Sequence, residues 1–145
     1  MSVRVAKSAG FCFGVSRAVE LVEQAAKAGK KVVTLGPIIH NHHVVDKFRA
    51  LGVEVIDTPE QACPGQTVII RSHGVSRAVY EELQRRGVEI IDATCPFVKR
   101  IHGLVSQAEA EGRLPVIIGT PTHPEVEGIA GWCGDCRIFD RADVL

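Results

Sequence analysis

Two cysteines lie where the sequence predicts that a strand ends and a helix begins. Cys12 stands in Gly-Phe-Cys-Phe-Gly, directly before a helix expected from Val15, and Cys95 stands in Asp-Ala-Thr-Cys-Pro, after a strand expected over residues 88–92. The amide groups and the positive dipole at a helix start favour a thiolate, which is the form of cysteine that binds iron. The alternative for each cysteine is a small buried residue that only packs in a turn.

Three histidines follow other expected strands in the same way. His40, His73 and His123 come within a few residues of strands expected over residues 32–35, 67–71 and 115–119. Imidazoles beside helix amino termini suit an anionic ligand such as a phosphate or a diphosphate, because the rings and the helix amides both donate hydrogen bonds. The alternatives are a zinc or iron site, which lacks a closely spaced histidine pair on a helix, or solvated loop residues.

Glu125 follows His123 by two positions and is expected in the same site. A partly desolvated carboxyl group there could hold a proton and deliver it to a substrate. Taken alone, Glu125 is more often a solvated acid in the first turn of a helix that begins at Pro124.

The other cysteines give weaker signals. Cys133 and Cys136 have the spacing of a redox pair or of half a zinc site, but no second copy of the motif exists, which favours incidental cysteines. Cys63, in Ala-Cys-Pro-Gly, is typical of a turn.

Alternating strands and helices must position these side chains. Apolar spacing predicts helices over residues 15–28, 44–51, 76–86 and 98–112, and a strand over residues 3–6 is expected before Cys12. A near-repeat at residues 51–57 and 86–92 indicates that a strand-loop-helix-strand unit occurs twice. These patterns predict an α/β fold with a parallel sheet flanked by helices. Parallel strands share their carboxyl edge, so the cysteines and histidines should meet in one cleft.

Charge and hydropathy make two classes of partner unexpected. Among the 145 residues, 17 Lys and Arg balance 17 Asp and Glu, and no basic stretch of the kind that binds nucleic acid is present. No apolar run approaches the ~20 residues of a membrane span, and the first residues do not resemble a secretory signal. We expect a cytoplasmic protein whose five cysteines are free, metal-bound or catalytic.

Five segments together resemble the 4-hydroxy-3-methylbut-2-enyl diphosphate reductase family, the last enzyme of the non-mevalonate isoprenoid pathway. They are residues 10–18, 40–45, 72–75, 92–96 and 123–128, in the family's order and spacing. The resemblance implies a reductive dehydroxylation that yields isopentenyl and dimethylallyl diphosphates.

The resemblance also implies a role for each candidate residue. A 4Fe-4S cluster would be held by three thiolates, of which Cys12 and Cys95 match two, while the third cysteine would lie beyond this chain. Histidines at the positions of His40, His73 and His123 would bind the diphosphate. Glu125 would supply protons, and ferredoxin or flavodoxin would donate the electrons.

Family members have three α/β units around a central cleft. By this resemblance the chain would hold the first unit, residues 1–95, and an incomplete second unit, residues 96–145, and as a fragment it would be inactive alone. Two other functions stay open. One is a non-catalytic diphosphate-binding module without metal, and the other is a thiol redox protein that works through Cys133 and Cys136.

Overall fold

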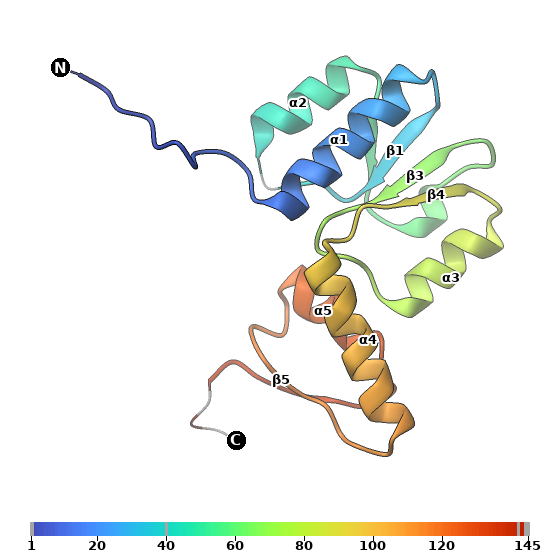
Figure 1. Ribbon diagram of the computed structural model, residues 1–145. Helices are drawn as coiled ribbons and strands as arrows, with labels where there is room; N and C mark the ends of the chain where they lie inside the picture. Colours follow the sequence, from blue (N-terminus) through green and yellow to red (C-terminus); the bar gives the residue numbers. More distant parts are fainter. Residues whose placement is uncertain (1, 40, 142, 144–145) are drawn as a thin grey trace.

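Strands and helices alternate along the chain in the computed structural model, which describes residues 2–39, 41–141 and 143 (Figure 1). Each expected helix is confirmed, with ends that differ from the prediction by one or two residues. The helices are α1 (Phe13–Lys27), α2 (His42–Ala50), α3 (Arg77–Arg85), α4 (Pro96–Ala110) and α5 (Pro124–Ala130), with a short 3-10 turn at Pro59–Gln61. The strands are β1 (Val32–Leu35), β2 (Glu54–Ile56), β3 (Thr67–Ile70), β4 (Glu89–Asp92), β5 (Val116–Ile118) and β6 (Arg137–Phe139).

The strands form two parallel sheets. The first sheet has the order β2-β1-β3-β4, and β5 pairs with β6 in a second sheet. This arrangement confirms the predicted α/β fold with parallel strands and flanking helices. It differs from the expectation of one shared edge, because the strand before His123 belongs to the second sheet.

Side chains of the first sheet pack alternately against helices on its two faces. Val32 of β1 belongs to a buried cluster with α1 and α2, which includes Val22 and Phe48. The next residue, Val33, points the other way and packs in a cluster that includes Leu83 of α3. Figure 1 shows α1 and α2 on one face of the sheet and α3 on the other. Both faces are covered, as buried parallel strands require.

The strand predicted over residues 3–6 is wrong. These residues have no regular structure, and Val3 and Val5 are 89% and 78% exposed. A strand is stable only when a neighbouring strand takes up its backbone hydrogen bonds, and residues 3–6 pair with none in the described part of the chain. The segment runs away from α1 instead (Figure 1).

The two sheets are joined through α3, α4, α5 and the loop after α5. The backbone N–H of Arg77 donates to the carbonyl of Gly131 at 3.2 Å. A Cβ atom built on Gly131 would lie 2.1 Å from Cβ of Ser76, so the end of α5 approaches the start of α3 too closely for any other residue. The division of the chain at residue 95 into two units stays a prediction.

No helix in the described ranges is both long enough and apolar enough to cross a bilayer.

Candidate active site

Cys12 and Cys95 occupy the same local position in two different helices. Cys95 is the N-cap of α4, and Cys12 is the N-cap of α1, which begins two residues earlier than the sequence predicts. Pro96 takes the first position of α4, where its missing N–H leaves no hydrogen bond unmade. Neither sulfur accepts the usual capping hydrogen bond. Cys12 is exposed and Cys95 is half-buried.

A glycine allows the two cysteine turns to approach one another. Gly14 follows Cys12 by two positions and is buried. A Cβ atom built on Gly14 would lie 2.6 Å from Sγ and 3.0 Å from Cβ of Cys95. The start of α1 therefore packs directly against the Cys95 thiol, and any larger side chain at position 14 would displace that thiol.

Arg17 joins α1 to the turn before Cys95 by hydrogen bonds. Its guanidinium donates to the carbonyl of Thr94 at 3.3 Å and to the carbonyl of Asp92 at 3.2 Å. The Asp92 carboxylate accepts from Lys99 Nζ at 2.6 Å and from the N–H of Thr94 at 3.0 Å. Burial acts to raise the pKa of Asp92, but the hydrogen bonds from Lys99 and Thr94 outweigh it and lower this pKa. The turn is thus held by an ionised carboxylate.

The turn of Cys95 is also bonded to the turn that carries His73. The N–H of Cys95 donates to the carbonyl of Ser72 at 2.9 Å, and the N–H of Ala93 donates to the carbonyl of Ile70 at 3.1 Å. Ser72 is buried and directly precedes His73. The pairing of β3 with β4 therefore continues past the strand ends and brings the cysteine and histidine loops together.

His73 and His123 meet although they follow strands of different sheets. Their ring centroids lie 6.0 Å apart, with the rings at 85° to one another. His123 is the N-cap of α5, and its Nδ1 accepts a hydrogen bond of 3.2 Å from the N–H of Glu125. In the neutral ring this bond leaves the proton on Nε2, which is then the donor to any ligand.

Of the two remaining predicted site residues, Glu125 is described by the structure and His40 is not. Glu125 lies in the first turn of α5 and is half-buried, joined to His123 by the bond just described. His40 lies outside the residues that the structure describes. The chemical roles of Cys12, Cys95 and the histidines stay predictions.

Two thiolates are a partial donor set for an iron-sulfur cluster. Cysteine thiolates are the usual ligands of such clusters, and Cys12 and Cys95 stand on turns in direct contact, so they fit as two of its ligands. Within residues 2–39, 41–141 and 143, no three Cys, His, Asp or Glu side chains gather closely enough to hold a metal ion. A further ligand would have to come from outside this set.

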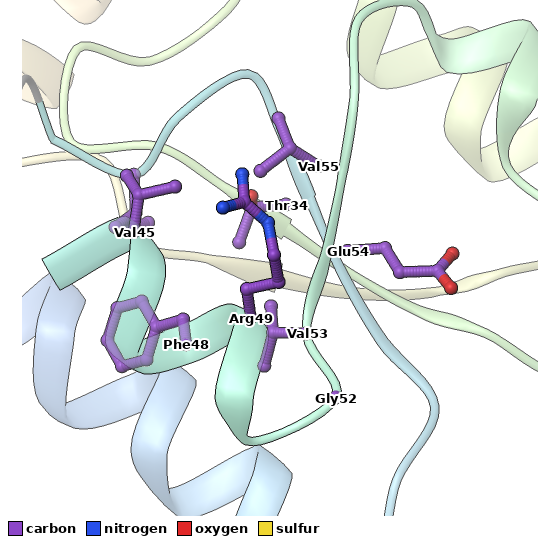
Figure 2. Close-up of a pocket in the computed structure, with 9 residues that line it drawn as sticks. Thr34, Val45, Phe48, Arg49, Gly52, Val53, Glu54 and Val55 are labelled. Carbon is purple, nitrogen blue, oxygen red and sulfur yellow. The ribbon is translucent and has the colours of Figure 1, made fainter. Parts of the chain in front are cut away.

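Two cavities contain none of the predicted cysteines, histidines or Glu125 in their walls, although the second borders the Cys95 turn at Asp92, Thr94 and Lys99. A cavity of about 410 Å³ opens beside α2 and β2, and Figure 2 shows its wall of Val45, Phe48, Arg49 and neighbouring residues. None of the predicted site residues lines it. A second cavity of about 540 Å³ is lined by His102 and Trp132, whose rings stack at 5.2 Å. Burial lowers the pKa of His102, which favours a neutral ring.

Sequence reasoning missed the residues that hold the site together. Gly14 and Arg17 belong to a recognised segment, but only their contacts with the Cys95 turn give them a positioning role. The signal that could have found Arg17 is that it is the single charged residue in the first turns of this helix.

The amino-acid sequence matches a family model described as "LytB protein" over residues 3–144. A curated relative from Thermoanaerobacter sp. (strain X514), named 4-hydroxy-3-methylbut-2-enyl diphosphate reductase, is 46% identical over 139 residues, which cover 93% of this chain and 48% of the relative. A relative of the same name from Aquifex aeolicus is 46% identical over 138 residues, covering 94% of this chain and 47% of the relative. The chain thus spans about half the length of the curated relatives it matches.

Solved structures of reductases with similar names have the same fold as this chain. One is described as (E)-4-hydroxy-3-methyl-but-2-enyl diphosphate reductase, the terminal enzyme of the non-mevalonate pathway, and is 44% identical with a TM-score of 0.82, covering 97% of this chain and 51% of that one. Another, the E-1-hydroxy-2-methyl-but-2-enyl-4-diphosphate reductase from Plasmodium falciparum, is 31% identical with a TM-score of 0.89, covering 94% of this chain and 44% of that one. Because the family model matches nearly the whole sequence and the fold agrees, the chain belongs to the LytB protein family.

Proposed function

We propose that this chain supplies part of the active site of an iron-sulfur reductase that removes the hydroxyl group of 4-hydroxy-3-methylbut-2-enyl diphosphate. The observation that carries the proposal is a continuous series of three contacts that joins four turns. Gly14 touches Cys95, the N–H of Cys95 bonds to Ser72, and the next residue, His73, packs against His123. We infer that the thiol and imidazole groups of these turns line one site.

Cys12 and Cys95 would hold a 4Fe-4S cluster together with a third cysteine from outside this chain. When bound, the cluster would supply the two electrons that the reductive loss of a hydroxyl group needs, delivered in turn by ferredoxin or flavodoxin. Gly14 and Arg17 would fix the distance between the two thiolates by packing α1 against the Cys95 turn. A chain without this third ligand should not turn over substrate alone.

His73 and His123, together with His40, would bind the diphosphate group. The bond from the Glu125 N–H to Nδ1 orients the His123 ring and leaves its Nε2–H to donate to a phosphate oxygen. Because the two described rings are within 6.0 Å of each other, one diphosphate can contact both.

Glu125 would deliver protons during the reaction. Loss of the hydroxyl group as water takes one proton, and formation of the new C–H bond takes another. Glu125 is half-buried and its own N–H bonds to His123, so its carboxyl group would lie near the rings that we propose bind the diphosphate. A carboxyl group in such a position is suited to general acid catalysis.

A chimera tests the proposal, because the chain spans about half the length of its relatives. Residues 1–145 would replace the matching half of the Thermoanaerobacter reductase, and consumption of the allylic diphosphate would be measured anaerobically with a reduced flavodoxin. We expect turnover by the chimera and none by the chain alone. A correctly folded chimera that forms its cluster but does not consume this substrate would contradict the proposal.

The same chimera tests the role of Glu125. Glu125→Gln should keep substrate affinity and lose turnover by about 10²-fold or more, as expected for removal of a general acid. Glu127→Gln is the matched control, since Glu127 is an exposed acid in the same helix. Equal turnover by the two variants would show that Glu125 is not the proton donor. Iron analysis separates the reductase from a metal-free diphosphate-binding module, which would contain none.

A further inference from the structure

A second pair of thiols lies in the loop between α5 and β6, away from Cys12 and Cys95. Cys133 and Cys136 are both half-buried, and Sγ of Cys133 donates to the carbonyl of Ala130 at 3.4 Å. Cys136 lies three positions further along the same loop, and its thiol interacts electrostatically with that of Cys133. The proposed reductase chemistry uses neither thiol, so this pair needs its own explanation.

We propose that Cys133 and Cys136 form a site of reversible oxidation, which closes an intrachain disulfide by exchange with a small-molecule disulfide. Two observations support this assignment. The two cysteines stand three positions apart in one short loop, and their side chains interact, so a disulfide between them closes a very small ring of the chain. Both side chains are also partly accessible to a small reagent, whereas a buried structural cysteine is inert.

The exchange balances in two steps. The thiolate of Cys136 attacks one sulfur of the external disulfide, which leaves a mixed disulfide and releases one thiol. Cys133 then loses its proton and attacks the Cys136 sulfur, which forms the intrachain bond and releases the second thiol. The protein loses two hydrogens and two electrons, and the external disulfide gains them.

The proposed order follows from the surroundings of the two thiols. Burial raises the pKa of Cys133 to about 11, and the charge and hydrogen bond of Cys136 add to the increase, followed by Glu109 and Asp135. At neutral pH Cys133 is therefore protonated and is a poor first nucleophile. It becomes effective only when the mixed disulfide on Cys136 holds a reactive sulfur beside it.

The pair is linked to the packing of the two sheets through its neighbour Trp132. The indole Nε1–H of Trp132 donates to the carbonyl of Val75 at 2.8 Å, and its ring stacks on His102 of α4. The carbonyl of Trp132 accepts from Ser106 at 2.7 Å and from Arg77 at 3.0 Å. Because Trp132 directly precedes Cys133, closing the disulfide would act on the contact between α3 and α4.

Mass spectrometry tests the proposal directly. Trypsin would release residues 114–137 as one peptide, which contains Cys133 and Cys136 and no other cysteine. After the full chain is treated with excess glutathione disulfide, we expect this peptide to be lighter by two hydrogens and to resist alkylation at both positions, with full recovery of alkylation after dithiothreitol. Peptides in which both thiols still alkylate, or in which glutathione remains bound to either one, would overturn the proposal.

Variants separate the pair from the other thiols. Cys63→Ser should leave the result unchanged, because Cys63 is an exposed turn residue outside the pair. Cys133→Ser should trap glutathione on Cys136, and a variant that traps none would contradict the proposed order of attack.

Fluorescence gives a second readout that does not depend on enzyme activity. Trp132 is the only tryptophan in the chain, so its emission reports on this loop alone. Oxidation should change the emission reversibly in the unaltered chain and not in Cys136→Ser. The same change in both proteins would show that the signal does not come from the disulfide.

Discussion

Gly14→Ala is the most informative single substitution in the site. The added methyl group would lie 2.6 Å from Sγ and 3.0 Å from Cβ of Cys95, well inside van der Waals contact. The thiol of Cys95 must rotate away, or α1 must move off the turn that Arg17 fastens. Either response changes the position of the Cys95 thiol relative to the Cys12 turn.

The expected change in the free energy of unfolding combines two opposing effects. Forcing a methylene into a packed contact costs about 1–3 kcal/mol. Replacing glycine by alanine within a helix stabilises the helix by up to about 1 kcal/mol. Gly103→Ala in α4 isolates the second effect, because nothing lies within 4 Å of a Cβ atom built there. Gly14→Ala should therefore be less stable than Gly103→Ala by about 1–3 kcal/mol.

Urea unfolding followed by circular dichroism measures this difference in the free energy of unfolding. Alkylation of the folded chain, followed by peptide mapping, measures the reactivity of the Cys95 thiol, which should change in Gly14→Ala and not in Gly103→Ala. Two variants of equal stability with equal Cys95 reactivity would refute the inferred contact between α1 and the Cys95 turn.

Three other substitutions test hydrogen bonds that hold the Cys95 turn and the Trp132 loop in place. Arg17→Met removes the charged hydrogen bonds to two backbone carbonyls and should lower the free energy of unfolding by about 1.5–3 kcal/mol. The control Arg100→Met, at an exposed position, should change it little in the same urea assay. The lowered pKa of Asp92 means that its carboxylate stabilises the fold above the unfolded-state pKa of about 3.9, and that this contribution is lost as the pH falls through the folded-state pKa. The stability difference between the unaltered chain and Asp92→Asn should therefore shrink in acid, and a difference that stays constant between about pH 7 and pH 3 would contradict this role. Trp132→Phe removes the bond to the Val75 carbonyl and should cost about 0.5–1.5 kcal/mol in thermal or urea unfolding, so an unchanged stability would contradict that bond.

The sequence predicts well what depends on local patterns. The apolar spacing of α1 and α4 locates both helices to within two residues, and it therefore predicts that Cys12 and Cys95 lie close to their starts. A helix makes its own backbone hydrogen bonds, so its pattern is contained in one segment. A strand needs a partner from elsewhere, which is why residues 3–6 have the composition of a strand and no strand structure.

Contacts between distant segments are not readable from one sequence. The stacking of His102 on Trp132 joins residues 30 positions apart, and neither residue carries a motif that points to the other. The meeting of His73 with His123 was expected from a single shared sheet edge. It occurs instead across two sheets, because α5 packs against the start of α3 at Gly131.

Anaerobic iron-sulfur reconstitution tests the central claim most directly. The chimera with the Thermoanaerobacter half should gain a broad visible absorption with iron and sulfide, and Cys63→Ser should keep it. Cys12→Ser and Cys95→Ser should each abolish the absorption and the stoichiometric iron, because each would remove one of the two proposed ligands, whose turns meet at Gly14. A full cluster in either of these two variants would contradict the account.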